Sequence, residues 1–240
     1  MDPVELKSPN RALVVVAHPD DADFGSGGTV AKWIASGVEM HFCVATNGDL
    51  GGFDRSIDRK EIPAIRQAEQ LAAAAVYGVK SVEFLDFVDG SLEPNIDLRR
   101  DISRVIRKIK PDTIICQSPD RNFARIQASH PDHLAAGEAA LRAVYPDARN
   151  PFAFPELLEE GLEPHTVGQV LLMAAADFNY VSDVTDFIDK KVAALLEHHS
   201  QLPKPEELPN IVKTWANDSA ERAGLAPGRS AELFFLVKTA

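Results

Sequence analysis

The chain has 240 residues and a formal net charge of −11 at pH 7. An acidic protein lacks the basic face that a nucleic-acid backbone or an anionic membrane surface requires, so neither is an expected partner. The length suits one large α/β domain over residues 1–240, and no stretch rich in Pro, Gly or Ser divides it. We therefore expect a single domain.

The two cysteines and the N-terminus bear on the compartment. Cys43 and Cys116 each lie in an apolar run, as expected for buried free thiols rather than a disulfide. Residues 1–10 carry charges and two prolines instead of the apolar segment of a secretion signal. No apolar run approaches the roughly 18 residues of a membrane helix. The sequence predicts a cytoplasmic protein.

Strand-like and helix-like segments alternate along the chain. Short runs rich in Val, Ile, Leu and Phe are typical of strands that are buried on both faces. They cover residues 12–17, 38–46, 82–87, 113–117 and 168–175.

Between these runs, apolar residues recur at helical spacing. One amphipathic helix is indicated by Leu98, Ile102, Val105, Ile106 and Ile109, and Pro111 closes it. Similar stripes run from Ile65 to Val76, ending at Gly78, and from Ile188 to Leu196. This alternation predicts an α/β fold, a Rossmann-like, doubly wound, mostly parallel sheet flanked by helices.

In such a sheet, ligands bind beyond the carboxyl ends of the strands. Polar residues follow each of the first four predicted strands: His18 to Asp21, Thr46 to Asp49, Asp86 to Gly90, and Ser118 to Arg121. We expect these residues to converge on one rim.

The segment His18-Pro19-Asp20-Asp21 carries the strongest chemical signal. A buried strand rarely ends in an imidazole and two carboxylates unless a cation or a reactive group lies there. Adjacent aspartates cannot easily point the same way, so one would ligate a metal and the other would act as a general base towards a water molecule. His18 would be a neutral ligand.

A second cluster, His130-Pro131-Asp132-His133, can complete the site. An open catalytic zinc site typically has three protein ligands. Pro131 is a favoured first residue of a helix, so the two histidines would flank a helix start. One of them can bind metal, and the other can face a developing oxyanion as an imidazolium. The residues themselves indicate a metal-dependent hydrolase.

Together, the two clusters resemble the LmbE-like or PIG-L family of zinc-dependent N-acetylglucosamine-type deacetylases. The resemblance extends over nearly the whole chain through Thr46-Asn47-Gly48-Asp49, Arg66-Gln67-Ala68-Glu69, Asp89-Gly90 and His199-Ser200-Gln201. It implies removal of an N-acetyl group from an amino sugar or glycoside, with a small-molecule substrate and Zn²⁺ as cofactor.

The resemblance also implies roles for individual residues. His18, Asp21 and His133 would hold zinc, Asp20 would be the general base, and His130 would assist at the tetrahedral intermediate. Arg66 and Asp89 fall where relatives contact sugar hydroxyls, although an arginine on a helix is as often a solvated or ion-paired side chain.

Two positions depart from the family pattern. The usual glutamate after the two aspartates is Ala22 here, and the next carboxylate is Asp23. We expect activity to survive with altered support around the site. Some members place a tyrosine two residues before the first histidine of the second cluster, where this chain has Ala128. Substrate preference can differ for that reason.

Other segments have weaker signals. Gly25 to Val30 partly mimics a dinucleotide-binding loop, but Val30 replaces the third glycine and nearby carboxylates would repel a pyrophosphate. We expect these glycines to let a helix approach the sheet closely. Residues 146–164 are too long and irregular for a simple connection, which favours either a substrate-side loop or a subunit contact in a homo-oligomer.

The remaining polar candidates have structural interpretations. Asp132 is expected to be a first-turn residue or a support for a ligand. His41 is expected to be a packed or surface histidine, and His165 and His198 to be surface residues.

Three functions stay open at this point. The first is the N-deacetylase, and the second is an amidase that cleaves a larger acyl group from a thiol-sugar conjugate. The third is a non-catalytic sugar-binding protein with a decayed site, which the retained ligand set disfavours. Fe²⁺ or another divalent ion could occupy the same ligands in place of zinc, because selectivity depends on metal availability as well as affinity.

Overall fold

We describe residues 6–240 of a computed structural model. The expectation about residues 1–10 falls partly outside these residues. A seven-stranded sheet has the order β3-β2-β1-β4-β5-β7-β6. Its strands are β1 (Arg11–Val16), β2 (Glu39–Thr46), β3 (Ser81–Phe87), β4 (Thr113–Gln117), β5 (Gln169–Met173), β6 (Tyr180–Asp183) and β7 (Ala231–Lys238).

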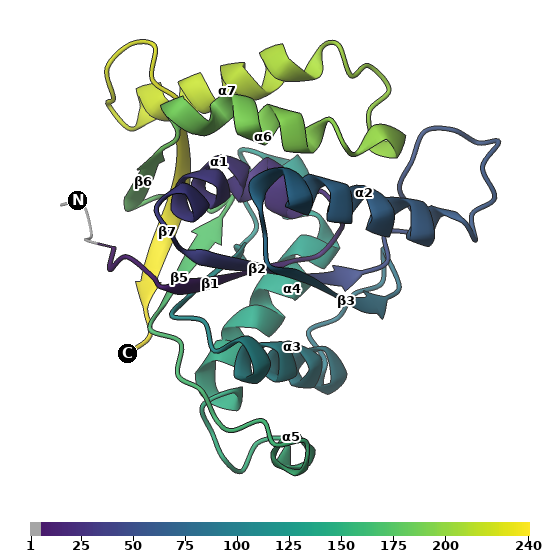
Figure 1. Ribbon diagram of the computed structural model, residues 1–240, viewed down its shortest axis with the longest axis vertical. Helices are drawn as coiled ribbons and strands as arrows, with labels where there is room; N and C mark the ends of the chain where they lie inside the picture. Colours follow the sequence, from purple (N-terminus) through teal and green to yellow (C-terminus); the bar gives the residue numbers. More distant parts are fainter. Residues whose placement is uncertain (1–5) are drawn as a thin grey trace.

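Helices cover both faces of this sheet (Figure 1). On one side lie α1 (Asp21–Ala35), α2 (Ile62–Tyr77), α6 (Ile188–Leu195) and α7 (Leu208–Arg222), and on the other lie α3 (Ile96–Ile109), α4 (Pro131–Arg142) and the short α5 (Pro155–Glu159). Short helical turns occupy Ile126–Ser129, Ala143–Asp147, Thr185–Phe187 and His199–Gln201. The predicted Rossmann-like, doubly wound fold is confirmed.

The two faces of β1 show why its sequence is a continuous apolar run. Leu13 and Val15 pack into the core on the α3/α4 side, and Val14 and Val16 pack into the core on the α1/α2 side. All four side chains are fully buried. A strand covered on both faces has no position for a polar residue until it ends.

Five strands were predicted, and all five are present and mutually parallel in the sheet. The antiparallel edge formed by β7 and β6 was not predicted. β6 has only four residues, and its side chains are mostly half-buried, so no apolar run marks it. On β7, Leu233, Phe235 and Val237 are only half-buried, unlike the fully buried residues of β1.

The start of α1 confirms the expectation about its glycines. A Cβ on Gly28 would lie 2.8 Å from Cβ of Val184, and a Cβ on Gly25 would lie 2.5 Å from Sδ of Met173. Both distances are too short for a real side chain. Glycine therefore lets α1 approach β5 and the segment after β6 closely.

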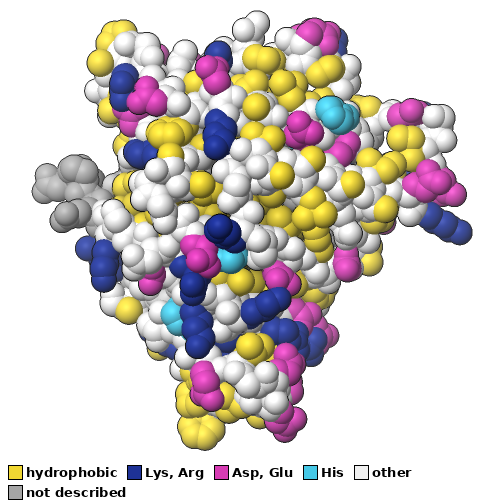
Figure 2. Space-filling view, viewed as in Figure 1, with side chains coloured by type: hydrophobic (Ala, Val, Ile, Leu, Met, Phe, Trp, Pro, Cys, Tyr) yellow, Lys and Arg dark blue, Asp and Glu magenta, His cyan; other side chains and the backbone are white. Residues whose placement is uncertain are grey.

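Charged side chains of both signs mingle over α3 on the face shown in Figure 2. Arg100 pairs with Asp97 and Asp101, and Arg104 pairs with Asp101 and Glu160. These are the polar residues expected opposite the apolar stripe of an amphipathic helix. No helix within residues 6–240 is long and apolar enough to cross a membrane.

Candidate metal centre

The first cluster lies in the turn between the end of β1 and the start of α1. β1 ends at Val16, and the backbone N–H of Ala17 donates to Oε1 of Gln117 at the end of β4, 3.0 Å away. The chain then turns through His18 to Asp21, the first residue of α1. Asp20 has φ 94° and ψ −28°, a left-handed conformation that is uncommon for a non-glycine residue. The turn is therefore sharp and locally strained.

His18 lies at the centre of a group of carboxylates. Its Nδ1 is 3.2 Å from Oδ2 of Asp21, and its Nε2 is 3.1 Å from Oδ1 of Asp89 and 3.2 Å from Oδ2 of Asp132. His18 is 8% exposed, and Asp89 and Asp132 are buried as well. Several buried carboxylates around one ring concentrate negative charge, which a cation would compensate.

The second cluster begins α4, as its proline predicted. Pro131 is the first residue of the helix, and His130 caps it by accepting a hydrogen bond at Nδ1 from the Asp132 backbone N–H, 3.2 Å away. Nε2 of His133 lies 3.1 Å from Oδ1 of Asp21. Asp21 therefore contacts both His18 and His133, one with each carboxylate oxygen.

The three histidine rings converge on one point. Ring centroids are 5.0 Å apart for His18 and His130, 5.2 Å for His18 and His133, and 5.4 Å for His130 and His133. Residues separated by more than a hundred positions are thus neighbours, because β1 and β4 are adjacent parallel strands. The predicted rim exists.

Asp132 supports this arrangement. Its carboxylate accepts backbone N–H groups from Gly90, at 2.7 Å, and Leu92, at 3.2 Å, besides contacting His18. The side chain is fully buried. The interpretation of Asp132 as a first-turn residue that supports a ligand agrees with these contacts.

The carboxylate of Asp20 pairs with Arg66 on α2, and His198 and His18 lie close enough for their charges to act on it. Its Oδ2 lies 3.2 Å from Nη2 of Arg66, which also donates to the carbonyl oxygen of Pro19, 2.6 Å away. Nη1 of Arg66 donates to the carbonyl oxygen of Gly48, at 2.9 Å, and lies 3.9 Å from Oδ2 of Asp89. Arg66 is 4% exposed, so its immediate role is to hold the loops after β1 and β2 together.

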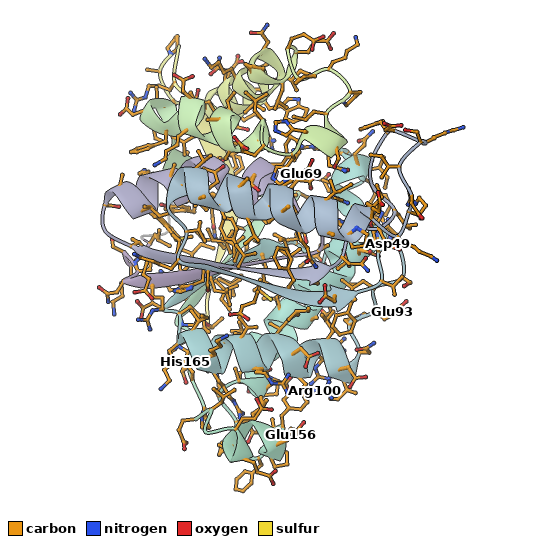
Figure 3. The ribbon with its side chains drawn as sticks, turned by 45° about the vertical axis from the view of Figure 1, so that its right-hand side comes forward. Asp49, Glu69, Glu93, Arg100, Glu156 and His165 are labelled. Atoms are coloured by element: carbon orange, nitrogen blue, oxygen red, sulfur yellow. The ribbon has the colours of Figure 1, made fainter. Side chains whose placement is uncertain are left out.

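The loops that follow β2 and β3 meet beyond the carboxyl ends of these strands, beside the first cluster. The carboxylate of Asp49 accepts the backbone N–H of Asp89, and the carboxylate of Asp89 accepts the backbone N–H of Leu50, both at 3.2 Å. Asp49 and Glu93, on these two loops, lie at the carboxyl end of the parallel strands, and His165 lies towards the opposite end (Figure 3).

The environment shifts several pKa values. Burial by itself lowers the pKa of His18, but Asp132, Asp21 and Asp89 outweigh it and raise that pKa to about 12. Burial by itself raises the pKa of Asp21, but His133 and His18 hold that pKa well below the usual range. Burial raises the pKa of Asp20 to about 6 against the lowering effect of Arg66.

The two histidines of the second cluster are shifted in opposite directions. Burial and the neighbouring His18 lower the pKa of His130. Burial also lowers the pKa of His133, but the neighbouring Asp21 outweighs this effect and raises that pKa. The lowered pKa favours the neutral ring of His130, and in that form the hydrogen bond accepted at Nδ1 places the proton on Nε2. This differs from the imidazolium expected from the sequence, because burial and His18 favour the uncharged form.

The donor set fits a divalent metal. Side-chain donor atoms within 4.8 Å of one another form two groups, one of His18, His130 and His133, and one of His18, Asp89 and Asp132. Imidazole nitrogens and carboxylate oxygens are the mixed ligands of catalytic zinc sites. Of the predicted ligands, His18 and His133 belong to the first group. Asp21 belongs to neither, but its carboxylate contacts both of these histidines.

A second buried polar cluster lies behind Asp20, and sequence reasoning missed it. The carboxylate of Asp23 pairs with Nε2 of His198, 3.0 Å away, and accepts Nε2–H of Gln70 at 2.9 Å. All three side chains are buried. The prediction that His198 is a surface residue is wrong, because α6 turns it inwards onto α1. A carboxylate inside the apolar start of α1 was the available signal.

The structure also locates the other residues that the sequence analysis singled out. Glu69 on α2 accepts the backbone N–H and the hydroxyl of Ser200, both at 2.7 Å, so the two motif segments touch. His41 is buried and bonds to Ser81 and Glu39, as a packed histidine would. His165 is partly exposed at the surface and lies 2.8 Å from the carbonyl oxygen of Pro111.

Residues 146–164 pack on α3. Nη2 of Arg107 donates to the carbonyl oxygens of Asp147, Asn150 and Ala153, and its Nε donates to that of Ala148. This segment includes α5, which lies below α3 in Figure 1 and well away from the loop after β2. A substrate-side position is not what these contacts indicate.

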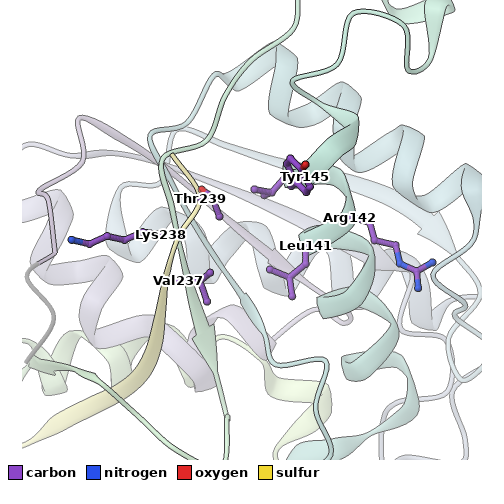
Figure 4. Close-up of a pocket in the computed structure, with 7 residues that line it drawn as sticks. Leu141, Arg142, Tyr145, Val237, Lys238 and Thr239 are labelled. Carbon is purple, nitrogen blue, oxygen red and sulfur yellow. The ribbon is translucent and has the colours of Figure 1, made fainter. Parts of the chain in front are cut away.

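Two surface pockets lie apart from the histidines. One, of about 450 Å³, is bounded by the loop after β2, the start of α2 and the turn at His199, and Glu69 lines it. The other, of about 400 Å³, lies at the far end of α4 beside β7, where Leu141, Tyr145 and Val237 form its apolar wall (Figure 4). Neither contains a candidate metal ligand.

Comparison with known proteins agrees with this geometry. Residues 13–144 match the family model described as PIG-L: GlcNAc-PI de-N-acetylase. The chain is 31% identical to the diacetylchitobiose deacetylase of Thermococcus kodakarensis, over 81% of this chain and 71% of that protein. It is 30% identical to a probable N-acetyl-alpha-D-glucosaminyl L-malate deacetylase 2 of Bacillus cereus, over 80% and 83%.

Among solved structures, the N,N'-diacetylchitobiose deacetylase from Pyrococcus horikoshii superposes with a TM-score of 0.87 at 30% identity. The match covers 96% of this chain and 84% of that one. The matched family region contains both histidine clusters, and the structural match extends beyond it to the antiparallel edge. This chain belongs to the PIG-L, or LmbE-like, family of deacetylases.

Proposed function

We propose that this protein is a zinc-dependent hydrolase that removes an N-acetyl group from an amino sugar or glycoside of the N-acetylglucosamine type. The observation that carries the proposal is the division of labour between Asp20 and Asp21. Asp21 lies between His18 and His133, whereas Asp20 faces Arg66. The named relatives, which are deacetylases, support the reaction class.

His18, Asp21 and His133 would hold the metal. A bound zinc ion supplies Lewis-acid chemistry, polarising the amide carbonyl and acidifying a water molecule. Fe²⁺ is a possible occupant of the same ligands, since such sites discriminate weakly between divalent ions. Asp89 and Asp132 would support His18 through its other nitrogen and fix the orientation of the ring.

Asp20 is the proposed general base. Its pKa of about 6 lies closer to neutral pH than that of an ordinary aspartate, which makes it a better proton acceptor there. In the proposed reaction, Asp20 takes a proton as the oxygen of water forms a bond to the acyl carbon. When the C–N bond breaks, the same proton passes to the amine, and acetate leaves.

His130 is proposed to assist at the oxyanion. Its Nδ1 is occupied by the Asp132 N–H, so the neutral ring has one N–H, on Nε2. Such a donor, aimed where negative charge develops, lowers the barrier to the tetrahedral intermediate. Since Ala128 stands where some relatives have tyrosine, more of this stabilisation would fall to His130.

Arg66 and Asp89 were predicted to bind sugar hydroxyls, and we keep Asp89 in that role at the inner edge of the site. Nη1 and Nη2 of Arg66 donate to Gly48, Pro19 and Asp20, and its Nε is buried. Its contribution to substrate binding would therefore be indirect, through the shape of the loops it holds. A cytoplasmic location stays a prediction of the sequence.

The test is an assay of acetate and free-amine release from N-acetylglucosamine and N,N'-diacetylchitobiose. We expect release by the zinc-loaded protein, loss after chelation and recovery when zinc is returned. Release that is insensitive to chelation contradicts the metal-dependent reaction. Bound metal without acetate release, but with cleavage of a longer acyl chain, would instead indicate the amidase.

A further inference from the structure

The backbone of Asp20 is held in a conformation that needs support. Its φ of 94° is in the left-handed region, where a side chain with a Cβ is strained. This conformation ends the turn after β1 and lets α1 begin at the next residue. As a result, the two adjacent carboxylates diverge, one towards Arg66 and one towards His18 and His133.

The side chain of Gln70 accepts the backbone N–H of Asp20. The acceptor atom, Oε1 of Gln70, lies 2.8 Å from the Asp20 nitrogen. Gln70 lies on α2 one turn after Arg66, on the same face of the helix. Arg66 binds the Asp20 carboxylate, and Gln70 binds the Asp20 backbone. α2 thus grips this residue at two points.

Gln70 is itself fixed from behind. Its Nε2 donates to Oδ2 of Asp23, at 2.9 Å, and the same oxygen lies 3.0 Å from Nε2 of His198. Gln70 and Asp23 are fully buried, and His198 is 1% exposed. Because Asp23 is an acceptor, the amide cannot turn over, and its oxygen stays aimed at Asp20. This series of hydrogen bonds joins α2, α1 and the residues that follow α6.

We propose that Gln70, anchored by Asp23 and His198, is a positioning residue for Asp20. Without it, the partly buried N–H of Asp20 loses its acceptor, and the strained turn relaxes. The carboxylate would then leave the position from which it takes a proton, while the ligands His18, Asp21 and His133, which contact one another, stay in place. The inference rests on the proposed role of Asp20 as the general base.

The experiment compares Gln70→Met with Gln67→Met. Methionine keeps the size of the side chain and removes both hydrogen bonds. Gln67 lies one turn earlier on α2 and bonds to Asp86 instead, so its replacement is the matched control. For Gln70→Met we expect kcat to fall about tenfold to a hundredfold, as misplacement of a reacting group implies, with KM and zinc per chain within about twofold.

The control should keep the kcat of the unaltered protein. An unchanged kcat in folded, zinc-loaded Gln70→Met overturns the inference, and so does an equal loss in Gln67→Met. If Gln70→Met fails to fold, His198→Asn tests the inference instead. This change removes the partner of Asp23, which in turn holds Gln70. It is expected to show a smaller loss of kcat at full zinc content, and an unchanged kcat contradicts the anchoring chain.

A crystal structure of zinc-loaded Gln70→Met gives a readout independent of activity. We expect Asp20 to leave the left-handed region and its carboxylate to separate from Arg66. An unmoved Asp20 contradicts the inference. If the unaltered protein releases no acetate, the proposed function fails, yet this structural result still decides whether Gln70 positions Asp20.

Discussion

Asp20 and Asp21 are consecutive in the chain, yet their carboxylates serve different neighbours. Asp21 lies 3.2 Å from Nδ1 of His18 and 3.1 Å from Nε2 of His133, whereas Asp20 lies 3.2 Å from the guanidinium of Arg66. The left-handed backbone at Asp20 produces this divergence. One carboxylate is thereby available to a metal and the other to a proton.

Replacing Asp20 with asparagine should separate proton transfer from metal binding. The side chain keeps its shape but loses its basicity, so we expect turnover to fall about a hundredfold or more. Zinc content should stay near that of the unaltered protein, because Asp20 pairs with Arg66 and is not one of the proposed ligands. Elemental analysis and acetate release on the same sample measure both. Retained turnover would remove Asp20 from its role.

Replacing His133 with alanine should have the converse effect. The change removes one of the two rings that contact Asp21, and we expect zinc per chain to fall together with activity. Leu134→Ala, at the next position of α4, is the control and should keep its zinc. A full equivalent of tightly bound zinc in His133→Ala would eliminate it as a ligand.

Metal binding should weaken as the pH falls. In the metal-free protein the pKa of His18 is about 12, so at pH 7 its ring carries a proton that must leave before a metal binds. Lower pH adds protons that compete with the metal, and higher pH removes that competition. Titration with zinc at pH 7 in weakly buffered solution should release about one proton or more per metal. Zinc binding without proton release contradicts the assignment.

Arg107 should matter for stability and not for catalysis. This buried side chain donates to the carbonyl oxygens of Asp147, Ala148, Asn150 and Ala153. Methionine would leave those acceptors unpaired, and we expect a loss of about 2–4 kcal/mol in the free energy of unfolding. Arg104→Met breaks partly exposed ion pairs with Asp101 and Glu160 and should cost roughly 1 kcal/mol or less.

Urea unfolding of the metal-free proteins measures both losses. The kcat of Arg107→Met at a temperature where it is folded should match that of the unaltered protein. Equal stability losses in the two variants would show that residues 146–164 are not held on α3 by Arg107.

The parallel part of the fold could be predicted because burial on both faces leaves an unbroken apolar run in each strand. Leu13, Val14, Val15 and Val16 illustrate this, since alternate residues enter opposite cores. The edge strands β6 and β7 lack that signature, as one face of β7 is only partly covered. Their pairing depends on tertiary contacts that no local pattern encodes.

The residues of the metal centre could be predicted because charged groups beside a buried strand end need a reason to be there. What the sequence could not provide was which neighbours they meet. The Arg66 guanidinium binds loop carbonyls, and Gln70 on α2 bonds to Asp20 at the start of α1. The pair of Asp23 and His198 joins residues 175 positions apart. Such contacts follow from how the helices pack.

The most direct test of the account is a crystal structure of the zinc-loaded protein with anomalous scattering recorded on both sides of the zinc absorption edge. We predict one zinc peak per chain within bonding distance of His18, Asp21 and His133, with the carboxylate of Asp20 beside it but not bound to it. A peak held by His18, Asp89 and Asp132 in place of Asp21 and His133, or no peak at all in protein soaked with zinc, would contradict the proposed centre.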